Sequence, residues 1–227
     1  MRISLCLVLT LSSFAPAAML AKDVDQRLDS AAEVLTDMMH ASDKGIPQDL
    51  INKSTCMAII PGMKKGAFIV GAKYGKGFVV CRRTSGTGWT APAAIRVEGG
   101  SVGFQIGGSE QDVILLVMNK DGMSKLLKDQ FTLGGEATVA GGPVGRDAQA
   151  QTDAMMHAEM LSYSRSRGVF AGVSLDGATM RQDSDADEEM YGRKITNKEI
   201  LEGQPHAPVA SAKLEAELNR TSMHKSH

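Results

Sequence analysis

The first pattern along the chain is that of an amphipathic helix. Within residues 22–41, apolar residues recur at the spacing of one helix face: Val24, Leu28, Ala32, Leu35 and Met39. Acidic residues occupy the other faces of the same segment, as in a helix that packs on a core. The Asp-Lys-Gly sequence at 43–45 ends the pattern. Pro47 then suits the first turn of a short second helix that runs to residue 53.

From residue 56 onward the apolar residues form short runs separated by residues typical of turns. This alternation predicts short, mostly antiparallel strands joined by tight turns, the first of them at 61–62 and 74–77. The expected strands are residues 57–60, 67–70, 78–81, 93–97, 101–107, 112–118, 160–166 and 169–174. Residues 113–118 contain no polar break, which predicts a central strand.

The remaining segments predict further helices and loops. Asp121 is a candidate N-cap for a helix that runs to residue 128. Two more helices are expected near the C-terminus, at 198–201 and 212–218, and a Gly-rich passage covers 133–147. The fold class that follows is α+β, with a curved, mostly antiparallel, Gly-rich sheet, an N-terminal helical arm and C-terminal helices. A length of 227 residues fits one domain, which we place at 22–220 before a flexible tail at 221–227.

The first 21 residues have the features of a secretory signal peptide. Arg2 provides a positive start, residues 3–14 are apolar apart from Ser and Thr, and residues 15–21 contain small side chains suited to cleavage. The apolar segment is short and interrupted for a spanning helix, although an uncleaved N-terminal anchor is the alternative. We therefore expect an exported protein, periplasmic or secreted, that is peripheral on the envelope membrane.

Two cysteines remain after the predicted leader. Cys56 and Cys81 would lie in a compartment that permits disulfides, and the sequence is compatible with one bridge or with two buried thiols. Two cysteines without matching histidines do not make a structural zinc site. We expect neither a metal nor a cofactor.

Charge is balanced overall but uneven along the chain. The 25 basic and 26 acidic residues exclude a globally basic nucleic-acid binder. Residues 50–97 nevertheless contain eight cations and no acidic residue. If the short strands paired as hairpins, several cations would share one rim and contact phosphate groups of an anionic membrane, each contributing about 1 kcal/mol. The alternative is a solvated sheet edge whose lysines discourage aggregation. The candidate contacts are Lys64, Lys65, Lys73, Lys76, Arg82 and Arg83.

Segments that resemble catalytic or metal motifs lack essential parts. Residues 172–177 have the spacing G-x-S-x-x-G rather than that of a nucleophile elbow, and residues 141–146 lack the Lys-Ser/Thr of a phosphate loop. The acidic residues at 183–187 lack the Gly and Glu of a calcium loop, which predicts a solvated acidic loop. The sequence therefore favours a protein without catalysis. A hydrolase would need Ser174, Asp176 or His157 within mutual hydrogen-bonding reach.

An ordered set of motifs resembles the SYLF domain, also known as the Ysc-type actin-binding domain, over residues 28–218. The motifs are Ala-Ile-Ile at 58–60, Lys-Gly-Ala-Phe at 65–68, Gly-Lys-Gly at 75–77, Trp-Thr-Ala-Pro-Ala at 89–93, Gly-Phe-Gln-Ile-Gly at 103–107, Thr-Leu-Gly-Gly at 132–135, Gly-Pro-Val-Gly-Arg at 142–146 and the long run at 164–177. So many motifs in one order make the match highly specific.

The resemblance implies a phospholipid-binding module. Eukaryotic members bind phosphoinositides, partly through a basic amphipathic N-terminal helix, and some bind actin filaments. Here the corresponding helix at 22–41 is acidic, so phosphoinositide specificity does not carry over, and actin binding is doubtful in an exported chain. Peripheral binding of anionic phospholipid through the cations of residues 50–97 remains the expected function. A structural or protein-interaction module of the envelope without a lipid ligand is the alternative.

Overall fold

The structure, a computed structural model, describes residues 17–41, 45–85, 88–144, 157–166 and 169–222. The side chains of residues 17–22, 67–70, 101–107, 170 and 222 are not part of that description. Residues 1–16 of the predicted leader and 223–227 of the predicted tail also lie outside the described residues.

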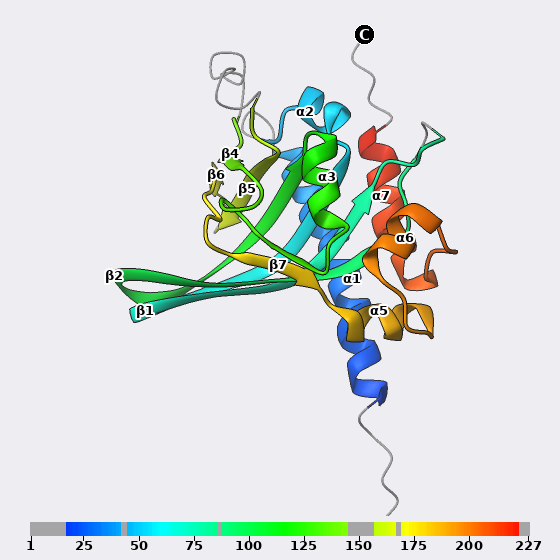
Figure 1. Ribbon diagram of the computed structural model, residues 1–227, viewed down its shortest axis with the longest axis horizontal. Coiled ribbons are helices and arrows are strands. Elements are labelled where there is room, and N and C mark those ends of the chain that lie inside the picture. Colours follow the sequence, from blue (N-terminus) through cyan, green and yellow to red (C-terminus); the bar gives the residue numbers. More distant parts are fainter. Residues whose placement is uncertain (1–16, 42–44, 86–87, 145–156, 167–168, 223–227) are drawn as a thin grey trace, which may run out of the picture.

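Helices and strands combine in an α+β fold, which confirms the predicted class (Figure 1). The helices are α1 (Ala17–His40), α2 (Gln48–Lys53), α3 (Lys120–Leu126), α5 (Ser184–Tyr191), α6 (Asn197–Gly203) and α7 (Ala212–Ser222), with a 3-10 turn, η3 (Val209–Ser211), before α7. The strands are β1 (Cys56–Cys81), β2 (Ala93–Val117), β3 (Gln130–Thr132), β4 (Val139–Gly141), β5 (Met160–Ser166), β6 (Val169–Gly172) and β7 (Thr179–Gln182).

In the described part of the chain these strands form one seven-stranded sheet with β2 at its centre. The order is β3-β7-β2-β5-β4, while β1 pairs with β2 and β6 pairs with β5. Residues 113–117 of β2 lie between β1 and β5, so the predicted central strand is confirmed. The pairs are antiparallel except for β4 with β5, which is parallel.

The two longest strands differ from the prediction of short strands and tight turns. β1 is one strand of 26 residues and β2 one of 25, and they pair along nearly their whole length. The turns predicted at 61–62 and 74–77 are wrong. Residues 61–62 form a bulge between Ile60 and Met63, and residues 74–77 pair regularly with residues 95–98. A Pro-Gly pair within a strand is typical of a bulge as well as of a turn.

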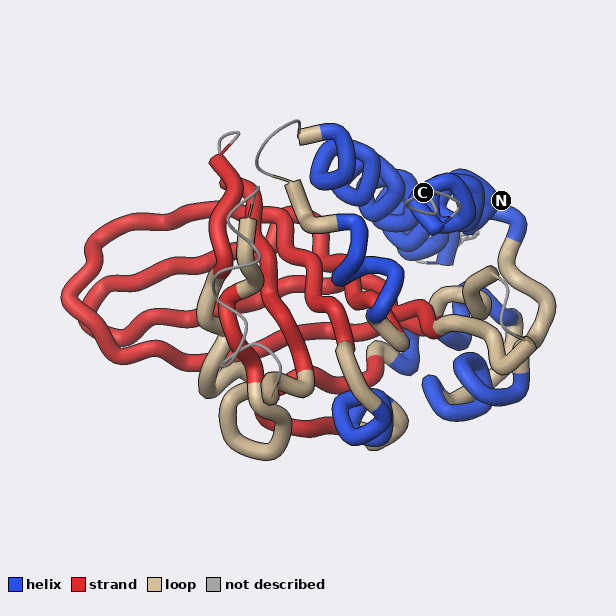
Figure 2. The backbone as a smooth tube through the Cα atoms, turned by 90° about the horizontal axis from the view of Figure 1, so that it is seen from above, coloured by secondary structure: helices blue, strands red, loops and turns tan. Residues whose placement is uncertain are grey.

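The ribbon of β1 and β2 bends back, so that the two ends of β1 meet. The register shifts between Ala67 and Ile69, where residues 103–107 of β2 follow the bend. At the other end, the N–H of Arg82 donates to the carbonyl of Thr55 at 2.8 Å. Figure 2 shows the strands of this ribbon extending away from the helices.

Two hydrophobic clusters occupy the two faces of the sheet. Alternate residues of β1 and β2 belong to different clusters, because successive side chains of a strand point to opposite faces. One cluster includes the apolar stripe of α1, where Leu28, Leu35 and Met38 have no exposed surface. Each such side chain contributes about 2 kcal/mol by burial, so α1 packs on the sheet. Among the described helices, none is long and apolar enough to span a bilayer.

Several helix boundaries differ from those expected. α1 begins at Ala17, so the last five residues of the predicted leader are helical. α3 is capped by Asn119, whose side chain accepts from the N–H of Gly122, rather than by Asp121. The acidic loop expected at 183–187 is wrong, since α5 begins at Ser184. The predicted tail begins too early, because α7 extends to Ser222.

Candidate functional site

The ribbon of β1 and β2 projects beyond the rest of the sheet (Figures 1 and 2). We call this projecting part, residues 63–74 of β1 and 98–111 of β2, the β-arm. β5 pairs with residues 112–117 of β2 and β7 with residues 95–98, so β5 ends before the β-arm and β7 reaches only its first residue on β2, Glu98. The six candidate cations all lie on β1 or directly after it, but the structure divides them into two groups.

Lys76 belongs to the group that has partners within the protein. Its Nζ lies 2.9 Å from Oδ2 of Asp183, whose side chain is 1% exposed. An Arg27 nitrogen lies 3.8 Å from the same oxygen. Lys76 therefore neutralises a buried carboxylate that joins β1 to the start of α5.

Arg82 and Arg83 also bind the protein itself. The guanidinium of Arg82 donates to the carbonyls of Ser54 at 3.0 Å and Ile51 at 2.9 Å, and its carbon lies 4.5 Å from the ring centroid of Trp89. Arg83 donates to the carbonyl of Trp89 at 2.6 Å. These contacts hold α2 and the 82–92 connection against the end of β1, so neither guanidinium is placed on the β-arm.

Lys65 and Lys73 lie together on one face of the β-arm. Side chains an even number of residues apart in a strand share a face, so Lys65 lies on the face of Met63 and Lys73 on the face of Val79. Met63 and Val79 belong to the same core cluster, so the two lysines lie on one face. Burial, and in second place the charge of Lys73, lowers the pKa of Lys65. The residues opposite them on β2 are uncharged: Ser109 and Gly99. This face therefore carries two adjacent cations without a facing carboxylate.

The opposite face of the β-arm carries Lys64 and Tyr74. Glu110 lies directly across from Lys64, and Glu98 lies across from Tyr74. Glu98 is within ion-pair distance of two arginines, Arg96 at 3.1 Å and Arg181 at 3.8 Å. The Tyr74 side chain is 45% exposed, which is unusual for a large aromatic residue. The sequence did not single out Tyr74, although its place between Lys73 and Lys76 was a signal.

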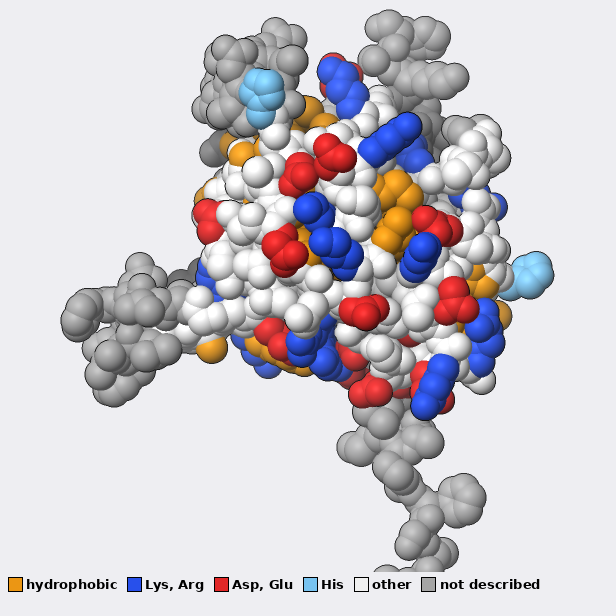
Figure 3. Space-filling view, in the orientation of Figure 1, with side chains coloured by type: hydrophobic (Ala, Val, Ile, Leu, Met, Phe, Trp, Pro, Cys, Tyr) orange, Lys and Arg blue, Asp and Glu red, His pale blue; other side chains and the backbone are white. Residues whose placement is uncertain are grey.

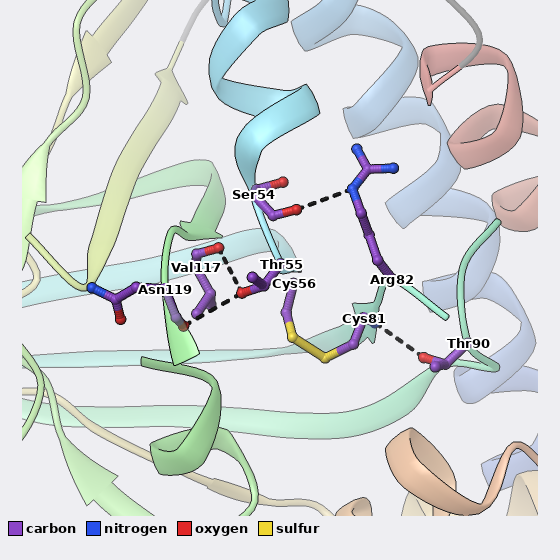
Figure 4. The surroundings of a disulfide bond; sticks show 8 residues. All are labelled: Ser54, Thr55, Cys56, Cys81, Arg82, Thr90, Val117 and Asn119. Carbon is purple, nitrogen blue, oxygen red and sulfur yellow. Dashed lines mark hydrogen bonds between the residues drawn. A yellow bond between two sulfur atoms is a disulfide. The ribbon is translucent and has the colours of Figure 1, made fainter. Parts of the chain in front are cut away.

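A disulfide closes the base of the ribbon (Figure 4). Cys56 and Cys81 are joined and fully buried, which is one of the two alternatives left open by the sequence. Thr55 Oγ1 donates to the carbonyl of Val117 at 3.0 Å, and the N–H of Cys81 donates to Thr90 Oγ1 at 3.0 Å. These bonds tie the ends of β1 to β2 and to the connection between the two strands.

Two buried carboxyl groups at the start of α5 were missed by the sequence analysis. Asp187 has no exposed surface, and its Oδ1 accepts from the N–H of Ala94 at 2.7 Å. Burial, aided by the charge of Asp183, raises the pKa of Asp187 to about 7. Acidic residues in a first helical turn were the available signal for a helix here rather than a loop.

A polar cleft of about 480 Å³ lies between α1 and the start of the β-arm. Its lining includes Asp23, Asp37, Glu110 and Asp112, whereas Arg165 forms ion pairs with Asp37 and Asp112. The excess of carboxylates makes this cleft unsuitable for a phosphate group. Figure 3 likewise shows acidic and basic side chains interspersed on the face that it displays.

The residues that a hydrolase would use are not assembled in the described part of the chain. Ser174 Oγ donates to Asp176 at 2.6 Å, which is a contact within one exposed turn. His157 is exposed, and no hydrogen bond joins it to either residue in the parts that the structure describes. The described residues also contain no group of three or more His, Cys, Asp or Glu side chains that could hold a metal ion.

Comparison with known proteins gives the family. Residues 98–221, 124 of the 227, match the Ysc84 family, described as Las17-binding protein actin regulator. The chain belongs to the Ysc84 family. The resemblance to the SYLF domain is thereby confirmed. The matched residues include the whole β2 half of the β-arm and the rest of the sheet after it.

Relatives of the Ysc84 family cover most of this chain. An SH3 domain-containing protein of Schizosaccharomyces pombe is 36% identical over 177 residues, which are 77% of this chain and 41% of that protein. LAS seventeen-binding protein 3 of Saccharomyces cerevisiae is 33% identical over 183 residues (79% and 39%). Human SH3 domain-containing YSC84-like protein 1 is 35% identical over 173 residues (76% and 50%). The chain therefore matches half or less of the length of these relatives.

Proposed function

We propose that this member of the Ysc84 family is an exported protein that binds anionic phospholipid peripherally, without catalysis. The observation that carries this proposal is the pair of lysines, Lys65 and Lys73, on one face of a projecting β-arm. Lys64 lies at the same level on the opposite face. Lys76, Arg82 and Arg83 are left out of the contact because each has a partner inside the protein.

The lysine pair suits an anionic group for an electrostatic reason. Two adjacent ammonium groups repel each other, and a phosphate between them replaces repulsion by attraction. Each lysine near an anionic bilayer contributes about 1 kcal/mol, and salt screens the interaction. Three lysines therefore support reversible, salt-sensitive binding.

Export is supported by two features of different kinds. The predicted leader at residues 1–21 has the composition of a signal peptide. The disulfide between Cys56 and Cys81 is typical of proteins that fold in an oxidising compartment. Together they favour a periplasmic or extracellular membrane surface as the place of binding.

Vesicle sedimentation tests the proposed function. Protein without residues 1–21 is mixed with phosphatidylglycerol vesicles or with neutral phosphatidylcholine vesicles, at low and at high salt. We expect binding to the anionic vesicles at low salt only. The double variant Lys65→Glu/Lys73→Glu should weaken that binding at least about tenfold, because it reverses the charge of the pair.

A matched control makes the same charge change elsewhere. Lys194→Glu/Lys198→Glu alters two exposed lysines at the start of α6, far along the chain from the β-arm. It should bind the anionic vesicles nearly as well as the unaltered protein. Equal weakening by the two double variants would show that net charge, rather than the β-arm, is responsible.

A protein-interaction module is the rival function. The family description and the name of the yeast relative refer to binding of Las17, a protein partner rather than a lipid. A chain of that kind would be indifferent to vesicles at every salt concentration. The same sedimentation experiment therefore separates the two functions.

A further inference from the structure

Four residues lie on the two faces of the β-arm, three to six residues from its bend. β1 bends between Ala67 and Ile69. Lys64 and Lys65 precede residue 68 by four and three residues, and Lys73 and Tyr74 follow it by five and six. The close approach of Gly75 to the side chains of Ile60 and Met63 shows that the two halves of β1 lie next to each other close to these four positions. We call these four residues the collar: Lys64, Lys65, Lys73 and Tyr74.

The chain beyond the collar is free of charge. Residues 66–72 and 100–108 contain no Asp, Glu, Lys, Arg or His, although 22% of the whole chain is charged. The collar thus separates an uncharged end of the β-arm from the charged body. Lysine and an aromatic residue at such a boundary match a membrane interface, where a tyrosine ring and an ammonium group both reach the head groups.

The acidic residues beside the collar do not cancel its positive charge. Glu98 is paired with Arg96 and Arg181, and Glu110 faces Lys64. On the other face Lys65 and Lys73 remain without a facing acid. The level of the collar therefore keeps a positive balance toward a layer of phosphate groups.

From these observations we infer that the β-arm docks end-on in an anionic bilayer, with its uncharged end in the interface of one leaflet and the collar among the head groups. This inference rests on the proposed function and adds how the membrane is bound. The strand between the collar and the bend is three residues long on one side and five on the other. Its mean length is about 13 Å, less than half of a hydrocarbon core of about 30 Å. None of the described strands pairs with the outer edge of residues 99–111 of β2, and unpaired backbone groups restrict the end to the hydrated interface.

A tryptophan at position 74 reports the depth of the collar. The protein has a single tryptophan, Trp89, which is 4% exposed and gives a constant background. We expect the emission of Tyr74→Trp to shift to shorter wavelength on phosphatidylglycerol vesicles and to be quenched by brominated acyl chains. Val209→Trp, at a position 94% exposed on η3, is the matched control and should change in neither respect.

The outcomes separate this inference from the proposed function. Sedimentation with the vesicles but no quenching of Trp at position 74 would overturn end-on docking while leaving phospholipid binding intact. No sedimentation would overturn both. Soluble glycerol phosphate is a further probe. If millimolar glycerol phosphate released all of the protein from the vesicles, the protein would recognise phosphate alone, and docking would be overturned. Tyr74→Ala should weaken vesicle binding about tenfold, as expected for loss of a half-buried aromatic contact, with the thermal transition unchanged.

Discussion

Asp187 is fully buried, and the hydrogen bond from Ala94 and the nearby side chain of Gln182 offset only part of the effect of that burial on its pKa. Its Oδ1 accepts the N–H of Ala94, while its Oδ2 has no hydrogen-bond partner among the described residues. The nearest charges that affect its titration are those of Asp183, and Asp183 in turn faces Lys76 and Arg27. The two cations are therefore engaged with Asp183, and burial leaves Asp187 with a pKa of about 7.

This residue predicts a pH dependence of stability. The pKa of Asp187 is about 7 in the folded protein, against 3.8 for an aspartate side chain in water. The folded state binds the proton more tightly, so its stabilising effect is present below about pH 4 and is lost as the pH rises to about 7. Asp187→Asn should remove this loss, which is at most about 4 kcal/mol. Urea unfolding at pH 5 and pH 8 measures the difference.

A second substitution on the same helix controls for the loss of one acidic residue. Asp185 is exposed on α5, so Asp185→Asn should leave the pH dependence of unfolding as it is in the unaltered protein. A pH slope that Asp187→Asn did not reduce would show that another group titrates on unfolding.

At the same scale, the sequence located the cations of β1 but not the partners that several of them have inside the protein. The run of cations without acids led to Lys64, Lys65 and Lys73, because local charge can be read directly. It could not separate them from Arg82, whose partners are backbone carbonyls of Ser54 and Ile51. Every residue has a backbone carbonyl, so a charge pattern cannot show which carbonyls accept a hydrogen bond from an arginine. Buried Asp183 was equally invisible, since its cations come from α1 and β1.

Among the elements, β1 depends on glycine where its two halves approach. A Cβ added to Gly77 would collide with the carbonyl oxygen of Ile59 and lie 2.8 Å from the Cα of Ile60. Both obstacles are backbone atoms, so a side-chain rotation gives no relief. Gly66 on the same strand has no atom within 4 Å of the corresponding position.

Gly77→Ala should therefore destabilise the protein, whereas Gly66→Ala should not. The collision forces the two halves of β1 apart, and we expect a loss of about 2 kcal/mol or more in the free energy of unfolding. Gly66→Ala is expected to change it by less than about 1 kcal/mol. Chemical denaturation of both variants gives the comparison, and similar stabilities would contradict the close packing at Gly77.

The elements that the sequence predicted well are those with a clear apolar pattern. α1 was recognised because its apolar period matches the face that packs on the sheet, and the strands β5 and β6 were expected at 160–166 and 169–174. β1 and β2 were divided into short strands because Gly and Pro mark turns and bulges alike. Their side-chain faces depend on the bulge at 61–62, which shifts the alternation and so decides that Lys65, rather than Lys64, shares a face with Lys73.

In the molecule as a whole, the β-arm projects from a body in which both faces of the sheet are packed. α1 covers one face of the sheet, and the other face has its own core cluster. The disulfide lies where the ribbon leaves and re-enters this body, since it joins the first and last residues of β1. A rigid base suits end-on docking, because force applied at the far end of the ribbon is opposed at Cys56 and Cys81.

Breaking the disulfide should lower stability while leaving the fold in place. The bond closes a loop of 25 residues, so loop entropy alone makes the oxidised protein about 3 kcal/mol more stable than the reduced one. Cys56→Ala/Cys81→Ala should show a lower denaturation midpoint than the unaltered, oxidised protein at the same pH and salt concentration. Because both core clusters remain, it should still fold and bind anionic vesicles well below that midpoint. Equal midpoints with and without the bond would mean that the ends of β1 already meet in the unfolded chain. Loss of vesicle binding by a folded variant would mean that the β-arm needs the bond to keep its shape.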